Sequence, residues 1–63
     1  MKETTTIKFR VEEHESNSQY YLLHGIYNNT KSAINKIKKL VDSGVNKNNL
    51  FIIQITTTKK VIW

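Results

Sequence analysis

Two stretches of this chain are apolar at almost every position, and they limit how it can fold. Residues 20–23 are two tyrosines and two leucines, and residues 50–55 are apolar at every position except Gln54. A strand with one wet face alternates apolar and polar residues, whereas a continuous apolar run indicates cover on both faces. The chain has one amphipathic helix, which covers one face only. We therefore expect a second copy of the chain to cover the other face.

The length of the chain also favours a partner. Residues 1–63 form one small domain, and a monomer of this size buries only about 60% of its unfolded surface. The absence of cysteine excludes disulfides and thiolate metal sites and agrees with a reducing compartment. Neither an apolar run of about 18 residues nor a signal-peptide core is present. We expect a soluble cytoplasmic protein without a membrane partner, in the host cytoplasm if a phage encodes it.

The first three predicted elements are two strands and a turn. Over residues 4–13 apolar and polar residues alternate, as in a half-buried strand. Residues 14–19 are polar and predict a turn into a second strand over residues 20–27, where Gly25 indicates a bulge or a close backbone approach. The first strand is predicted to bury Ile7, Phe9 and Val11, and to expose Lys8, Arg10 and Glu12.

A helix is predicted from Lys31 to Ser43. Asn28, Asn29 and Thr30 provide oxygen atoms for the free amides of its first turn. Gly44 suits the left-handed residue that follows a helix, and Val45 can then contact Leu40 as in a Schellman motif. The apolar stripe of the helix is formed by Ala33, Ile34, Ile37, Leu40 and Val41.

The strand that begins at Leu50 completes a small α+β domain of ββαβ order. No turn signal interrupts residues 56–60, so one long strand is favoured over a fourth strand at residues 61–63. The sheet is then twisted, with three or four strands and one helix on one face. Two strand orders remain open: 2-1-3 with every pair antiparallel, or 1-2-3 with a right-handed parallel crossover.

Signals for catalysis are poor. His14 lies in the polar turn and His24 in a strand, and neither has the neighbouring ligands that a metal site requires. No glycine-rich phosphate loop and no nucleophile elbow is present. We predict that the protein is not an enzyme and uses no metal, cofactor or small-molecule substrate.

The basic residues are the first candidate for a binding surface. The net charge is +5: residues 1–30 carry three cations and four anions, and residues 31–63 carry seven cations and one anion. Such asymmetry suits a phosphate backbone or an acidic partner, but lysines also keep an apolar protein in solution. The candidate residues for nucleic-acid binding are Lys31, Lys36, Lys38, Lys39, Lys47, Lys59 and Lys60.

The apolar and aromatic residues are the second candidate. Tyr and Trp are frequent anchors of protein interfaces, and Trp63 at the end of a strand suits a partner's groove. The seam of the predicted homodimer is assigned to residues 20–23, 50–55 and 61–63. Its candidate interface residues are Tyr20, Tyr21, Leu22, Leu23, Leu50, Ile52, Val61, Ile62 and Trp63.

Size, lack of catalytic groups and composition together favour one functional class. Lys, Asn, Ile and Tyr are abundant, and these residues use A/T-rich codons, which suits a low-GC bacterium or its phage. We predict a non-enzymatic binding protein, a phage or mobile-element accessory protein that inhibits or regulates a host macromolecule by occupying its surface. The alternative is a nucleic-acid-binding protein that uses the lysine-rich helix face and tail.

Overall fold

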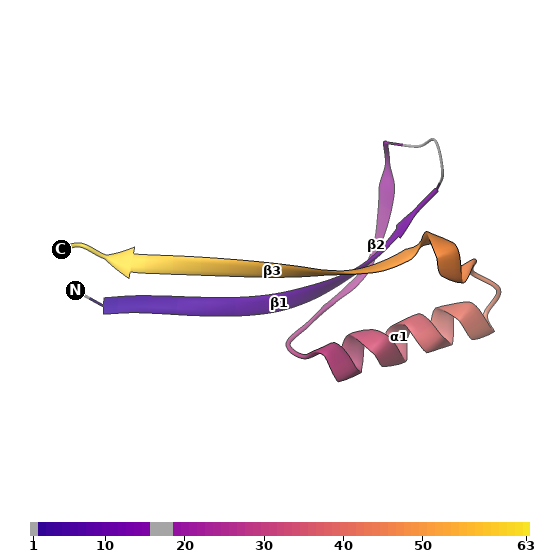
Figure 1. The fold of residues 1–63 in the computed structure, drawn as a ribbon, viewed down its shortest axis with the longest axis horizontal. Helices are drawn as coiled ribbons and strands as arrows, with labels where there is room; N and C mark the ends of the chain where they lie inside the picture. The colour runs from indigo at the N-terminus through magenta and orange to yellow at the C-terminus, as the bar shows by residue number, and fades with distance from the viewer. Residues whose placement is uncertain (1, 16–18) are drawn as a thin grey trace.

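The computed structural model describes residues 2–15 and 19–63, which form a three-stranded sheet and one α-helix (Figure 1). The predicted α+β class and ββαβ order are confirmed, and residues 16–18 of the predicted turn lie outside the described residues. A short 3-10 helix, η1, precedes the last strand. The elements are β1 (Lys2–His14), β2 (Tyr21–Tyr27), α1 (Thr30–Asp42), η1 (Lys47–Asn49) and β3 (Leu50–Val61).

The sheet is antiparallel throughout, in the order β2-β1-β3. Of the two predicted strand orders, 2-1-3 is therefore correct, and a parallel crossover is not formed. Residues 50–61 form one strand, as the lack of a turn signal predicted. The third strand of the chain thus lies beside the first, on the side of β1 away from β2.

β1 and β3 extend beyond the rest of the domain as a two-stranded arm. β1 pairs with β3 from Glu13 down to Lys2, but it pairs with β2 only between His14 and Phe9. We call residues 2–8 and 55–61 the arm. Both chain ends lie at its tip, and the molecule measures 50 × 26 × 12 Å (Figure 1).

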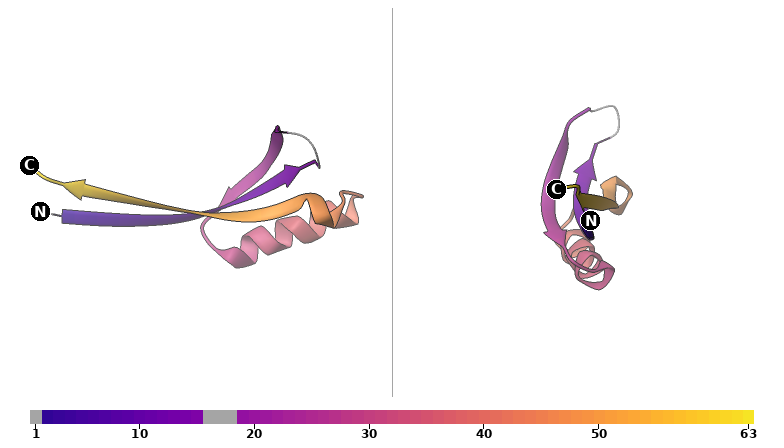
Figure 2. Two further views of the ribbon diagram at one scale, coloured as in Figure 1. Left: turned by 45° about the horizontal axis from the view of Figure 1, so that its top comes forward. Right: turned by 90° about the vertical axis from the view of Figure 1, so that its left-hand side faces the viewer.

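The hydrophobic core is small and lies between the sheet and α1. The helix contacts all three strands and lies on one side of the sheet (Figure 2). Among the described residues, the buried hydrophobic side chains are Val11, Ala33 and Leu50. Ala33 is the one buried residue of α1.

Both ends of α1 have the predicted caps. The side chain of Asn29 accepts a hydrogen bond of 2.8 Å from the amide of Ser32. At the other end, Val45 N–H donates to Leu40 C=O and Gly44 N–H donates to Val41 C=O, each at 3.0 Å. These two bonds define a Schellman motif, and Gly44 adopts the φ of +109° that the motif requires.

Gly25 lies beside a bulge, one of the two alternatives that its position in the strand predicted, and the side chain of Tyr27 lies close to it. The register of β1 against β2 shifts between Val11 and Glu12, directly beside the Val11–Gly25 pair. A Cβ atom on Gly25 would lie 2.6 Å from the hydroxyl oxygen of Tyr27, so a side chain here requires that ring to move.

Two predicted positions on β1 are wrong. Glu12 was expected in solvent but is 5% exposed, and its two carboxylate oxygens contact Arg10 and His14 on the same sheet face. Ile7 was expected to be buried but is exposed, because it lies in the arm, where no helix covers the sheet. Alternation along a strand assigns residues to faces, but burial depends on what covers each face.

We expect Gly44→Ala to lower the free energy of unfolding by about 1 kcal/mol, because a side chain is disfavoured at positive φ. Urea denaturation measures this change. Lys38→Ala, at an exposed helix position, is the control and should change stability by less than about 0.5 kcal/mol. An effect of Gly44→Ala no larger than that of the control would contradict the role of the left-handed residue.

Candidate functional site

The sheet face opposite α1 is an apolar surface that the helix leaves uncovered. Directly opposed residues in an antiparallel sheet point to the same face, so the register defines its members. Six large apolar members are each between 37% and 54% exposed. We call this surface the open face; it comprises Lys8, Arg10, Glu12 and His14 of β1, Tyr21, Leu23 and Ile26 of β2, and Phe51, Ile53 and Ile55 of β3.

A buried carboxylate lies near the centre of the open face. Glu12 Oε2 is 2.7 Å from Arg10 Nε, and Glu12 Oε1 is 2.8 Å from His14 Nε2. Both carboxylate oxygens therefore have a partner, as a buried charge requires. The three residues stand at alternate positions of one strand, so their side chains project from the same face.

Aromatic rings surround this charged cluster. His14 stacks on Tyr21 with the ring centres 5.3 Å apart, and Phe51 meets His14 edge-on at 5.4 Å. The guanidinium of Arg10 lies 5.7 Å from the centre of the Tyr21 ring and donates a hydrogen bond of 3.2 Å to its hydroxyl. The centre of the open face therefore combines apolar and aromatic side chains with the paired charges of Arg10 and Glu12.

The predicted interface residues of the strands fall on both faces of the sheet. Tyr21 and Leu23 lie on the open face. Leu50 is in the core, and Ile52 is half-buried opposite Val11 on the helix side. Leu22 lies opposite Glu13 and is exposed. A continuous apolar run therefore supplies only alternate residues to the open face.

The remaining predicted interface residues are exposed. Tyr20 precedes β2, and its side chain is 76% exposed. Val61, Ile62 and Trp63 lie at the arm tip, where they line a shallow hollow together with Lys2. The sequence analysis placed the tip residues in the same seam as the strands, whereas the structure separates them by the length of the arm (Figure 1).

The predicted nucleic-acid-binding lysines do not form one patch. Those of α1 and η1 lie on the domain body, whereas Lys59 and Lys60 lie on the arm (Figure 1). Lys36 is half-buried, and Lys31, Lys38, Lys39 and Lys47 are exposed.

The sequence analysis missed three groups of residues in these surfaces. It omitted Ile26, and it included Phe51, Ile53 and Ile55 only through the range 50–55. It also left Lys2 and Lys8 out of the basic candidates, and it treated Arg10 and Glu12 as separate solvated charges. Opposite charges at positions 10 and 12 of a strand are a signal that identifies such a pair, because alternate residues are neighbours on one face.

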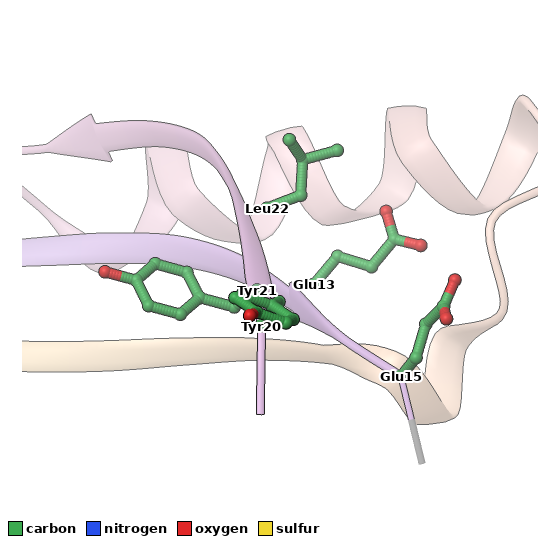
Figure 3. Close-up of a pocket in the computed structure, with 5 residues that line it drawn as sticks. All are labelled: Glu13, Glu15, Tyr20, Tyr21 and Leu22. Atoms are coloured by element: carbon green, nitrogen blue, oxygen red, sulfur yellow. The ribbon is translucent and has the colours of Figure 1, made fainter. Parts of the chain in front are cut away.

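A second hollow lies at the end of the β1–β2 hairpin. The carboxylates of Glu13 and Glu15 lie on one side of it, and Tyr20 and Tyr21 lie on the other (Figure 3). Glu13 also pairs with His24 at 2.9 Å, so this carboxylate already has a partner. Over residues 2–15 and 19–63 there is no group of three or more His, Asp or Glu side chains that suits a metal ion.

Comparison with known proteins assigns the chain to a family. The model of the plant transposon protein family matches residues 1–62. The chain belongs to the plant transposon protein family. No curated protein and no solved structure matches it. Membership in this family agrees with the predicted mobile-element protein. Within the described part of the chain, no helix has the length and apolarity needed to cross a membrane.

We expect Glu12→Gln to lower the free energy of unfolding by about 1–3 kcal/mol, because Arg10 and His14 lose a shared, buried anionic partner. Urea denaturation at one fixed protein concentration measures the loss. Glu3→Gln is the matched control, because Glu3 is exposed on the arm opposite Lys60, and it should change stability by less than about 0.5 kcal/mol. Equal effects of the two changes would show that the Glu12 cluster does not stabilise the sheet.

Proposed function

We propose that this plant transposon family member is a non-enzymatic binding protein that regulates or inhibits a host macromolecule by occupying its surface. The arm is the part of the molecule that reaches this partner. The observation that carries the proposal is that the paired strands of the arm extend from the body, although none of the described buried hydrophobic residues lies in the arm (Figure 2).

The exposure of the arm supports a role outside the domain itself. Apart from the half-buried Lys8, every residue of the arm is exposed, and none of its residues pairs with β2. Seven residues of paired strand extend about 20 Å. Holding this length in order costs conformational entropy without burying apolar surface within the chain. A partner that pairs with or covers the arm provides the missing burial.

The arm tip has the chemistry of an interface anchor. Trp63 is fully exposed, and Val61 and Ile62 beside it are 51% and 79% exposed. Large aromatic residues contribute most to binding when they enter an apolar pocket of a partner. Lys2 borders the same hollow, so the partner surface that fits best is an apolar groove with an acidic rim.

The arrangement of the histidines supports a non-enzymatic role. His14 and His24 each pair with a glutamate on the sheet surface. The hollow that His14 lines with Phe51, Ile52 and Ile53 is an open depression, whereas catalytic sites usually enclose their substrate.

We expect Trp63→Ala to reduce capture of the partner from a host lysate at least about tenfold, because it removes the largest anchor at the tip. Lys38→Ala, on the exposed side of α1, is the control and should capture the partner as the unaltered chain does. Capture is measured by pull-down with and without nuclease. A partner that Trp63→Ala retains fully, or that nuclease treatment releases, would overturn the proposal.

Nucleic-acid binding is the second candidate, and the distribution of charge on the arm favours it. Lys2, Lys8 and Lys59 project from one side of the arm, which has no acidic residue, while Glu3 lies opposite Lys60 on the other side. A two-stranded ribbon fits the major groove of duplex DNA, and lysines on one side contact its phosphates. If the protein binds DNA, the main contact is therefore made by the arm and not by the lysine-rich helix face that the sequence predicted.

If the second candidate holds, labelled duplex DNA is bound at 50 mM salt, and the affinity falls about 100-fold at 200 mM salt, as expected for about four phosphate contacts. Replacing Lys2, Lys8 and Lys59 by alanine should abolish binding. The control replaces Lys31, Lys38 and Lys39, which carry the same charge on the helix, and should retain most of it. Gel-shift titration measures both, and absence of binding at 50 mM salt would exclude this candidate.

A further inference from the structure

We propose that the open face is covered by the open face of a second copy of this chain. Two sheets then pack against each other, with one α1 helix on each outer side. This proposal concerns mainly the body of the domain, and the open face shares only Lys8 and Ile55, at the base of the arm, with the surface that the arm offers to its partner.

The accessible surface area of the single chain is large enough to include such an interface. The single chain exposes 5260 Å², whereas a compact monomer of its 7.4 kDa exposes about 4200 Å². The excess is comparable with the roughly 800 Å² that one partner loses in a standard protein interface. The arm contributes to the excess, but the exposed apolar side chains of the open face lie largely on the body itself.

The small core indicates why the molecule that covers the open face is a second copy of the chain. Val11, Ala33 and Leu50 are the only hydrophobic residues buried among those described, and such a core supports a domain of this size poorly. A partner that completes the core must be present whenever the chain is folded. A second copy always is, and it supplies apolar area on the face that α1 leaves uncovered.

The charges of the open face suit contact with an identical surface. In a two-fold symmetric dimer the same patch of each subunit meets its counterpart, so unpaired charges of one sign repel each other. Here Arg10 and His14 share the carboxylate of Glu12 near the centre of the face. Lys8 keeps its positive charge at the base of the arm, where it donates a hydrogen bond to the neutral side chain of Asn28. The unpaired lysines of α1 and η1 lie elsewhere on the body, so two open faces meet without net repulsion at their centre.

The mass in solution tests the proposal. We expect sedimentation or light scattering to give twice the 7.4 kDa of the chain. The midpoint of thermal unfolding should rise with protein concentration, because association stabilises only the folded state. A mass of one chain up to millimolar concentration, with a midpoint that does not depend on concentration, would overturn the proposal.

A pair of matched variants locates the interface. Ile53 on the open face and Ile34 on the helix are similarly exposed, at 37% and 44%. Ile53→Lys should give a single-chain mass, since each dimer would bury two unpaired cations, whereas Ile34→Lys should remain dimeric. If Ile34→Lys alone dissociates the dimer, the interface is on the helix and the proposal is wrong.

A milder variant, Ile53→Ala, tests the same interface if Ile53→Lys fails to fold. Ile53→Ala removes apolar area from both subunits without adding charge, and it should weaken association about tenfold or more while the far-ultraviolet circular dichroism at high concentration is retained. Unchanged association would contradict the proposal. Trp63→Ala should leave the mass unchanged, so failure of the dimer and failure of the arm proposal are distinguishable.

Discussion

The antiparallel pairing of β1 with β3 is the interaction on which the rest of the structure depends. It runs through twelve residue pairs, from Glu13 and Leu50 in the body to Lys2 and Val61 at the tip. Its inner part places Val11 and Leu50 under the helix, and its outer part forms the arm. The same ladder of hydrogen bonds therefore builds the core and brings both chain ends together.

This pairing divides the molecule into surfaces with different chemistry. One helix covers one sheet face, and the other face retains large apolar side chains around the Glu12 cluster. The arm carries lysines and threonines along its length and apolar residues at its tip. In a member of the plant transposon protein family, this organisation is the basis of our two proposals, that the body associates with a second copy and that the arm binds another macromolecule.

The elements themselves were predictable because their signals are local. Asn29 and Gly44 cap α1 through hydrogen bonds between residues close in sequence, and Gly25 lies where the register shifts. The antiparallel strand order was one of two alternatives, because periodicity does not state which strands pair. The burial of Glu12 was not predicted, since its partners Arg10 and His14 are themselves in contact with Tyr21 of β2 and Phe51 of β3.

The sequence by itself determined that the strands carry more apolar surface than one helix covers, because side-chain alternation and the number of helices are properties of the chain. It also determined where α1 begins and ends. Only the tertiary structure decided which apolar residues remain exposed: Leu50 entered the core, whereas Ile53 stayed on the open face. It also separated the residues of the arm tip from the sheet, because strand pairing, which is long-range, sets how far β1 and β3 extend beyond the body.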